Sequence, residues 1–326
     1  SFCTLLAPPA CTYIPPTTAE EMAGVTIEEA TRTDGFTFEF DAARPFAALT
    51  SDKEVVDSLS KWGLPPTALL GQHYRCDTFF RRGMADEFIL ALFNDPSFAA
   101  NFRVSDGKGG LRPWSPHAKV RSVKVTPVRA TLTSLDVFDA FDAPGIVRES
   151  GHIARCMDIY LPGGVTVANL LRAYFLVDPE EWPEQLLDLD GPDDVIPAET
   201  RDELLVRLMK AAVAGGALCQ WDDEFEPYKD AVRALYKDLV VVGKRVAEAH
   251  DSGDVEGDGN ASANNGPQLE VQSLVYQVHA AEFADGMEVP LFPRNDAGDA
   301  SNYMYVAIHP HRRTLSVLYH GFASPF

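Results

Sequence analysis

The chain has 326 residues, of which 46% are apolar, and a formal net charge of −20. This length suits one large domain or two modest ones, and the apolar fraction predicts a real hydrophobic core. The acidic balance argues against a nucleic-acid or membrane partner, because a negative surface repels phosphate backbones and anionic lipids, and no apolar run reaches the ~20 residues that a membrane span needs.

The N-terminal residues 1–34 predict a disordered tail. They are rich in Pro, Thr, Ala and Glu, and two proline pairs cannot enter the interior of a helix or sheet. The next residues differ, because Phe36, Phe38 and Phe40 alternate with polar residues at the period of a half-buried strand. A globular part is therefore predicted over residues 35–326.

Four elements are predicted in the first half of the globular part. A capping box of Ser and Glu begins a helix with one apolar face over residues 51–62. The apolar run at 88–93 ends in Asn-Asp-Pro and predicts a short buried helix. Valines over 120–128 predict basic-edged strands, interrupted at Pro127. Residues 135–141 predict a helix or an irregular turn with an apolar side.

The middle of the chain is predicted to be mainly helical. Ser150 and Thr166 are suited to cap two of the helices, and Pro227 suits the first turn of the last one. The acidic stretch 178–195 is predicted to be a loop, and residues 217–220 a short strand. The apolar spacing predicts helices over residues 150–160, 166–174, 197–214 and 227–239.

The C-terminal part is predicted to be β-structure after a flexible insertion. Residues 248–267 are almost free of apolar side chains and rich in Gly, Asp, Asn and Ser. Alternation over 274–280 predicts a strand. Residues 303–308 and 314–322 predict two more, which the short connection joins as a terminal antiparallel hairpin.

The predicted fold class is therefore α+β, a mixed globular fold with several short helices, a terminal antiparallel hairpin and a disordered N-terminal tail. A single domain over 35–326 is expected, which allows two lobes within it, 35–145 and 146–326. The odd number and wide spacing of the cysteines are typical neither of a disulfide framework nor of a thiolate metal site. Reduced cysteines and the lack of a recognisable signal peptide favour the cytosol. The five cysteines are Cys3, Cys11, Cys76, Cys156 and Cys219.

The charge is distributed unevenly along the chain. Residues 178–203 carry eleven acids against one base, and residues 103–129 carry seven bases against one acid. Such asymmetry predicts either electrostatic docking of a partner or simply a set of solvated loops. If the basic segment docks a partner, its contact residues are predicted to be Lys119, Arg121 and Lys124.

An aromatic side chain beside three acids makes residues 221–225 a candidate recognition loop. Loops between a strand and a helix carry function disproportionately. The alternative is that Trp221 and Phe225 are inward anchors, with the acids facing water near the helix N-terminus. As a recognition surface, the loop would act through Trp221, Asp222, Asp223, Phe225 and Tyr228.

Histidines near the predicted hairpin raise a metal hypothesis. Two imidazoles and one carboxylate can hold a metal ion, although isolated histidines more often have structural roles. Pro310 weakens the geometry of the His-x-His pair. The candidate ligands are His279, His309, His311, His320 and Asp222. Because the chain contains no nucleophile-elbow, P-loop or His-Glu-x-x-His motif, we expect no enzyme and no cofactor.

Three blocks of sequence carry a resemblance. They cover residues 148–156, 214–242 and 312–320, and a weaker string, Phe-Ile-Leu-Ala-Leu-Phe-Asn-Asp-Pro, covers 88–96. In these blocks the chain resembles the cilia- and flagella-associated protein 300 family. The resemblance extends over residues 36–322, apart from the insertion.

The resemblance implies a non-enzymatic cytoplasmic factor for the assembly or transport of outer and inner axonemal dynein arms in motile cilia and flagella. Expected partners are axonemal dynein subunits, other dynein assembly factors and the intraflagellar transport machinery. The expected location is the cytoplasm and the cilium or flagellum. The resemblance transfers no catalytic residue. Two alternatives stay open, namely a diverged metal-dependent, oxygenase-like enzyme and a structural component of the axoneme.

Overall fold

A computed structural model describes residues 35–161, 166–182, 186, 191–216, 220–244, 269–293 and 301–322. All of them except Gly35 belong to one compact unit, Phe36–Phe326. Helices and antiparallel strands are both abundant in this unit, so the predicted α+β class is confirmed. The predicted disordered tail and flexible insertion, and all but the last residue of the predicted strand 217–220, lie outside the described residues.

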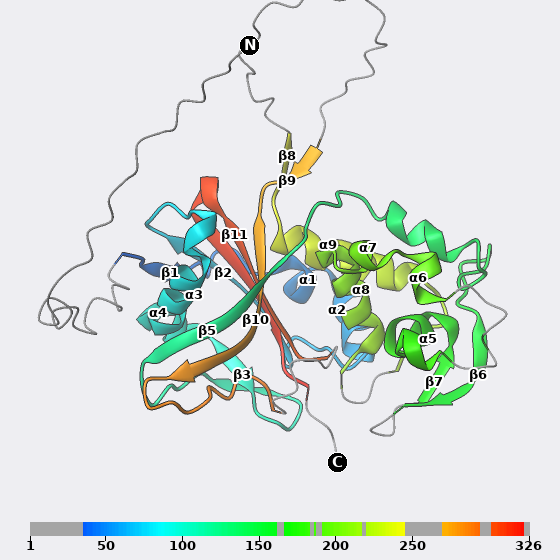
Figure 1. Ribbon diagram of the computed structural model, residues 1–326, viewed down its shortest axis with the longest axis horizontal. Helices are drawn as coiled ribbons and strands as arrows, with labels where there is room; N and C mark the ends of the chain where they lie inside the picture. The colour runs from blue at the N-terminus through cyan, green and yellow to red at the C-terminus, as the bar shows by residue number, and fades with distance from the viewer. Residues whose placement is uncertain are drawn as a thin grey trace, which may run out of the picture. The chain divides into compact units, whose positions relative to one another are not determined.

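A six-stranded antiparallel sheet forms the centre of the unit (Figure 1). Its strand order is β1-β2-β12-β11-β10-β5, which places the last strand of the chain beside the second. The predicted terminal hairpin is confirmed, since β11 and β12 pair antiparallel around a turn that contains Arg313 at φ 51°. The strands are β1 Phe38–Phe40, β2 Leu69–Cys76, β5 Val120–Val128, β10 Leu274–Phe283, β11 Tyr303–His309 and β12 Thr314–His320.

Helices cover both faces of the sheet. The short helices α3 (Ala85–Asn94) and α4 (Pro96–Asn101) lie against one face (Figure 1). The opposite face is covered by the helices α1 Ala47–Thr50, α2 Lys53–Lys61, α8 Leu204–Ala214 and α9 Glu226–Leu239, and α5 Leu170–Leu176 packs against α8 farther from the sheet.

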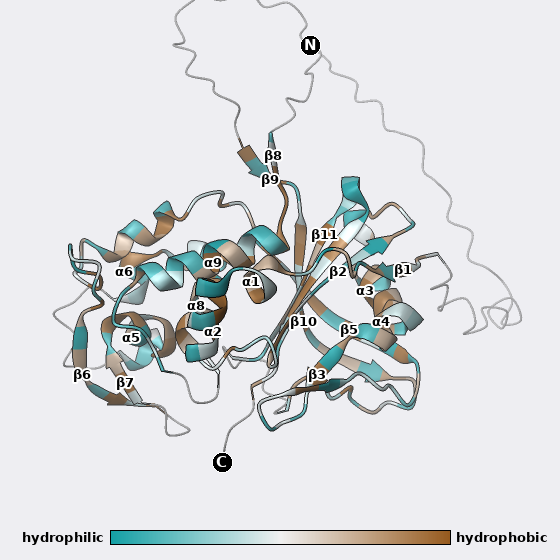
Figure 2. Ribbon diagram, turned by 180° about the vertical axis from the view of Figure 1, so that it is seen from behind, coloured by the Kyte–Doolittle hydropathy of each residue, from teal (hydrophilic) through white to brown (hydrophobic). Residues whose placement is uncertain are grey.

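Strand periodicity explains the two cores. Successive side chains of a strand point to opposite faces. In β11, Val306 packs into the core beside α3, whereas Tyr305 and Ala307 pack into the core beside α8 and α9. Figure 2 shows the apolar residues running along β10 and α8. The central strands are therefore buried on both sides, which explains their nearly continuous apolar sequences.

Smaller elements complete the described part of the chain. Three two-stranded ladders join β3 Arg103–Ser105 to β4 Leu111–Pro113, β6 Arg155–Tyr160 to β7 Thr166–Asn169, and β8 Val242–Lys244 to β9 Leu269–Val271. The remaining helices are short, namely α6 Pro192–Val195, α7 Ala198–Arg201, and the 3-10 turns Arg82–Met84, Asp136–Phe141, Pro179–Glu181 and Pro310–Arg312.

The helix predicted over 150–160 is wrong, because this segment forms β6 and pairs with β7. Met157 and Tyr160, which a helix with this apolar spacing would bury, are instead 73% and 77% exposed. The helix predicted from Thr166 begins only at Leu170, since residues 166–169 pair with β6 and Asn169 caps α5 through Arg172 N. Strand pairing has overridden the local helical spacing here.

The helix predicted over 197–214 is two helices, α7 and α8. Between them the buried carboxylate of Glu203 accepts hydrogen bonds from Thr131 N and Oγ1 at 2.8 and 2.7 Å, and Leu204 N donates to Arg129 O. These hydrogen bonds to Arg129 and Thr131, just after β5, hold the chain at Glu203 out of helical geometry. The acidic stretch predicted to be a loop likewise contains the short helix α6.

Other predicted helices are confirmed in place. Helix α2 follows its predicted apolar face, although its N-cap is Asp52 and not Ser51, because the Asp52 carboxylate accepts from Val55 N. Helix α9 has Pro227 in its first turn, and its predicted stripe of Val232, Leu235, Tyr236 and Leu239 is buried. In the described part of the chain, no helix combines the length and apolarity that crossing a bilayer would require.

Candidate functional site

The loop that leads into α9 is fastened to the end of α2 by Asp222. Its carboxylate accepts a hydrogen bond from Trp62 Nε1 at 2.8 Å and pairs with the ammonium group of Lys61. The backbone N–H of Asp222 donates to the hydroxyl of Tyr228 at 3.0 Å. The rings of Trp62 and Tyr228 stack with their centroids 4.2 Å apart. Asp222 thus provides hydrogen-bond partners for both members of a buried aromatic pair.

Trp221 is half-buried, and one face of its ring contacts the helices. The guanidinium carbon of Arg172 lies 4.6 Å from the centre of the Trp221 ring, a cation–π distance. Arg172 is itself 4% exposed and donates from Nη1 to Val213 O at 2.7 Å. The pair therefore connects the loop to both α5 and α8.

The second half of the loop pairs with the segment just before β6. Ile153 N donates to Asp223 O at 2.8 Å, and Phe225 N donates to Gly151 O at 3.0 Å. Arg155 adds two hydrogen bonds to the Asp223 carboxylate, at 3.0 and 3.1 Å. Two sequence blocks that carried the resemblance are thus in direct contact in space.

Phe225 closes this junction from inside. Its ring is 4% exposed and meets Phe138 and Phe141 edge-on. Of the five residues predicted as a recognition surface, only Asp223 is exposed; Phe225 and Tyr228 are buried, and Trp221 and Asp222 are half-buried. The anchor alternative therefore describes the contacts of this loop, and recognition by it stays a prediction that rests on Asp223.

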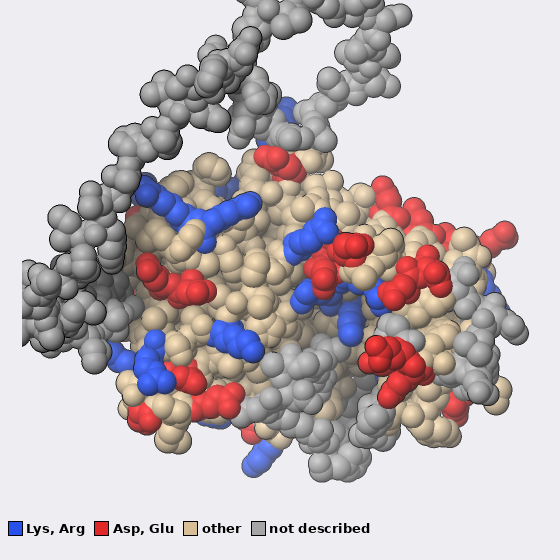
Figure 3. Space-filling model, in the orientation of Figure 1, with Lys and Arg blue, Asp and Glu red and all other residues tan. Residues whose placement is uncertain are grey.

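The basic candidates lie elsewhere, on the edge strand β5 and just before it. Lys119, Arg121 and Lys124 are all exposed. The Arg121 guanidinium donates to Glu282 Oε2 at 2.8 Å and holds the pKa of that carboxyl below its ordinary value. Figure 3 shows acidic side chains gathered over the helices at the right of the view, while the sheet side at the left carries Lys and Arg among further acidic side chains. The structure does not bring the basic segment and the 221–225 loop together.

The candidate metal ligands are dispersed. His309 is buried, with Nδ1 2.6 Å from Ser273 Oγ and Nε2 3.2 Å from Ser316 Oγ. Burial, reinforced by nearby Arg44, lowers its pKa to about 3. Among the described residues, no three His, Cys, Asp or Glu side chains form a group that could hold a metal ion. The other candidates lie apart from one another. His320 Nδ1 is 2.5 Å from Ser301 O, and His279 Nε2 is 2.8 Å from Thr126 Oγ1. His311 is exposed in the turn, and the Asp222 carboxylate accepts a hydrogen bond from Trp62 Nε1.

The histidine that does approach His309 was not predicted from the sequence. His73 in β2 places Nδ1 2.9 Å from Ser316 Oγ, so one serine connects both rings. Burial lowers the pKa of His73 to about 4. His73 approaches Ser316 because the two residues are paired in the β2–β12 register, and no local sequence motif reveals that register.

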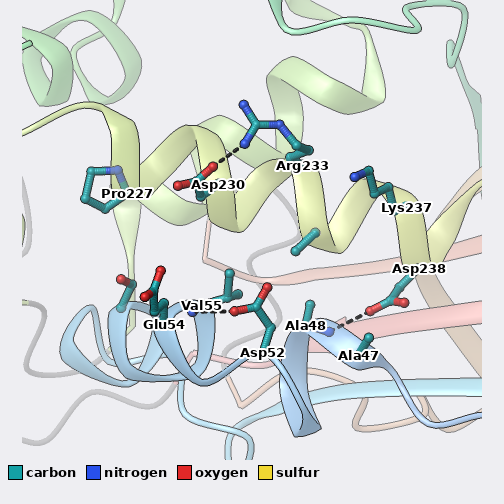
Figure 4. A pocket seen from close by; sticks show the side chains of 12 residues that line it. Ala47, Ala48, Asp52, Glu54, Val55, Pro227, Asp230, Arg233, Lys237 and Asp238 are labelled. Carbon is teal, nitrogen blue, oxygen red and sulfur yellow. Dashed lines mark hydrogen bonds and ion pairs between the residues drawn. The ribbon is translucent and has the colours of Figure 1, made fainter.

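The polar face of α9 borders a charged groove against α1 and α2 (Figure 4). The groove has a volume of about 480 Å³ and is lined by acids and bases together. Asp238 points from α9 toward α1 and accepts a hydrogen bond from Ala48 N at 2.8 Å. Burial raises the pKa of Asp238. On the same helix face Asp230 pairs with Arg233, and the lining as a whole carries four carboxylates against two bases.

Comparison with known proteins gives consistent matches. The family model for cilia- and flagella-associated protein 300 matches residues 36–320. A protein of that name from Chlamydomonas reinhardtii is 29% identical over 281 residues, which cover 85% of this chain and 95% of the relative. One from Paramecium tetraurelia is 24% identical over 272 residues, covering 83% and 88%. No solved structure matches the chain.

Proposed function

Because this chain belongs to the cilia- and flagella-associated protein 300 family, we propose that it is a non-enzymatic cytoplasmic factor for assembling or transporting outer and inner axonemal dynein arms. The observation that carries the proposal is the family match over residues 36–320, which spans nearly the whole compact unit. The relatives are named for their association with cilia and flagella. The finer role in dynein arms is our own step beyond those names.

The proposed partners are axonemal dynein subunits, other dynein assembly factors and the intraflagellar transport machinery. An assembly factor works by binding proteins transiently, and charged surfaces speed such encounters and select among partners. The exposed bases around β5 and the acids over α6 and α7 support a binding role of this kind. We interpret the hydrogen-bonded contact between residues 151–155 and 223–225 as part of the scaffold that holds these surfaces in place.

Gene disruption tests the proposal. The gene for this chain is disrupted in its source organism, and axoneme cross-sections are examined by electron microscopy together with swimming speed. We expect outer and inner dynein arms to be lost or reduced, with microtubule doublets intact. Re-expression of the chain restores the arms. Normal arms and normal motility in the disrupted cells would refute the proposed role.

A structural component of the axoneme is the second candidate, because the family name fits it equally well. The two roles predict different fractions after detergent extraction. An assembly factor is recovered mainly with the cell body and the soluble fraction, whereas a structural component stays with the axoneme alongside tubulin. Recovery chiefly in the extracted axoneme would favour the structural role.

A further inference from the structure

A second groove adjoins the first along α9 and shares Arg233 and Lys237 with it, and the charged side chains in its lining are all positive. It has a volume of about 500 Å³ and runs between α9, the segment at 133–135 and the start of β8. No carboxylate lines it, which is unusual in a chain with a net charge of −20. The cationic side chains around it are Arg44, Arg233, Lys237 and Arg312. This set is called the cationic groove below.

Three of these four cations make no direct ion pair in the described part of the chain, although Arg44 interacts electrostatically with Asp238 at longer range. Arg233 pairs with Asp230 and approaches Glu226 at 3.8 Å. Within the described residues, Arg44, Lys237 and Arg312 have no ion pair and no side-chain hydrogen bond. Three cations without a direct ion pair on one groove present an electrostatic attraction to an anionic ligand.

Apolar side chains form the base of the cationic groove. Leu205 and Val241 are buried beneath it, while Val242 is 40% exposed at its end. One wall is fixed in place, because the Tyr236 hydroxyl donates to Leu132 O at 2.8 Å and ties the 133–135 segment to α9. The groove thus combines a rigid apolar base with a cationic rim, a combination typical of peptide-binding sites.

We propose that the cationic groove binds a short acidic segment of a partner protein, in which carboxylates flank an apolar side chain. The carboxylates pair with Arg44, Lys237 and Arg312, and the apolar side chain packs on the base beside Val242. A small anion would leave the apolar base unused. Nucleic acid or an anionic membrane would meet repulsion from the rest of a surface with net charge −20.

The proposal deepens the proposed function, on which it rests for the identity of the partner as a protein of the ciliary assembly pathway. None of the three unpaired cations was predicted as a site from the sequence. Arg233 and Lys237 share one face of α9 at i, i+4 spacing, which the sequence does contain. Arg44 and Arg312 come from opposite ends of the chain and meet there only through the sheet.

The test uses the purified full chain and a fluorescein-labelled peptide, Glu-Glu-Leu-Glu-Glu-Leu-Glu-Glu, followed by fluorescence anisotropy at 50 mM NaCl. Two charge reversals, Lys237→Glu with Arg312→Glu, fall on exposed side chains. They replace two attractions by two repulsions, so we expect binding to weaken about tenfold or more. The charge-matched control, Lys108→Glu with Arg112→Glu, replaces two exposed side chains of the β3–β4 hairpin and changes binding less than about twofold.

The apolar half of the proposal is tested separately. Replacing both leucines of the peptide by serine, or Val242→Ser in the protein, is expected to weaken binding several-fold. The matched control is Met287→Ser, which alters an exposed apolar side chain outside the groove. Pyrophosphate serves as a competitor that carries charge without an apolar side chain, and it is expected to displace the peptide only at far higher concentration.

Three results would overturn the proposal, namely no binding of the acidic peptide, equal binding by the charge-reversed protein, or equal binding of the serine peptide. Displacement by pyrophosphate at peptide concentrations would assign the groove to small anions instead. These measurements use purified protein and are independent of axonemes. A failure of the peptide test would refute the proposed binding by the groove and leave the proposed function untouched. Intact dynein arms after gene disruption would refute the proposed function and leave the binding by the groove untouched.

Discussion

Asp222→Ala is the substitution that best separates the structural from the recognition role of the 221–225 loop. In the wild-type protein the carboxylate accepts from Trp62 Nε1 at 2.8 Å, and Trp62 is completely buried. Alanine leaves that indole N–H without an acceptor in an apolar setting. The neighbouring contact from the Asp222 N–H to Tyr228 uses the backbone and is retained.

The magnitude follows from these contacts. A hydrogen bond to a charged acceptor contributes about 1.5–3 kcal/mol, and a buried donor left unpaired loses the full value. The Lys61 side chain is 44% exposed, so its ion pair adds only about 0–1 kcal/mol. We therefore expect the free energy of unfolding to fall by about 2–3 kcal/mol in total.

Urea unfolding at pH 7, followed by tryptophan fluorescence and far-ultraviolet circular dichroism, measures this change. Glu224→Ala removes an exposed carboxylate from the same loop and is expected to stay within about 0.5 kcal/mol of wild type. A double-mutant cycle with Trp62→Phe, which deletes the donor, is expected to give a coupling energy of about 1–2 kcal/mol.

A loss below about 0.5 kcal/mol for Asp222→Ala, or strict additivity in the cycle, would refute this reasoning. The carboxylate would then contribute nothing to the fold. It would have to be reconsidered as a contact held ready for a partner.

Three further predictions concern buried groups. Burial depresses the pKa values of His73 and His309 to about 4 and about 3, so the unfolded chain binds more protons below pH 6.5. Stability should therefore be level above pH 7 and fall with acid by up to about 1.4 kcal/mol per pH unit for each histidine; equal urea midpoints at pH 7 and pH 5 would contradict this. Gly216→Ala places its Cβ 2.0 Å from Gly63 O and should prevent stable folding, whereas Gly83→Ala, with nothing within 4 Å, should melt like wild type. Burial raises the pKa of Cys76 to about 11, so iodoacetamide at pH 8 should label it only after denaturation; site-resolved mass spectrometry showing equal labelling of native protein would disprove this.

Elements with strong local signals could be predicted from the sequence. Helix α9 combines Pro227 in its first turn with an apolar stripe at helical spacing, and both signals agree with its tertiary contacts. The β11–β12 hairpin has short, strongly apolar strands and a connection of a few residues. In such cases the partner of each residue lies close by in the chain.

Elements that depend on distant partners could not be predicted. Strand β2 contains Gly71, Gln72 and His73 and shows no clear alternation, so no strand was expected there. It forms because β12 pairs with it, and the pairing of His73 with Ser316 spans 243 positions. Strand β6 was predicted as a helix for the same reason, since its partner β7 decides its conformation.

The candidate site shows the same contrast between local signals, which the sequence reveals, and contacts between distant segments, which it does not. The sequence singles out residues 221–225 as a loop that contains aromatic and acidic side chains, and the structure places them there. It does not reveal that Trp62 is the donor to Asp222, because nothing in the sequence links α2 to the loop before α9. For the cationic groove, only the Arg233 and Lys237 spacing on α9 was visible.

The position of β12 has a consequence for how the protein is made. Strand β12 sits between β2 and β11, so the two parts of the sheet cannot join until Thr314–His320 has been synthesised. At roughly 5–20 residues per second, β2 waits on the order of 10–50 s after translation before its partner leaves the ribosome. An early stop codon ahead of Thr314 would remove the strand that bridges both halves, leaving β2 and β11 with unpaired edges open to aggregation. Completion of the sheet in the nascent chain therefore depends on the synthesis of residues 314–320.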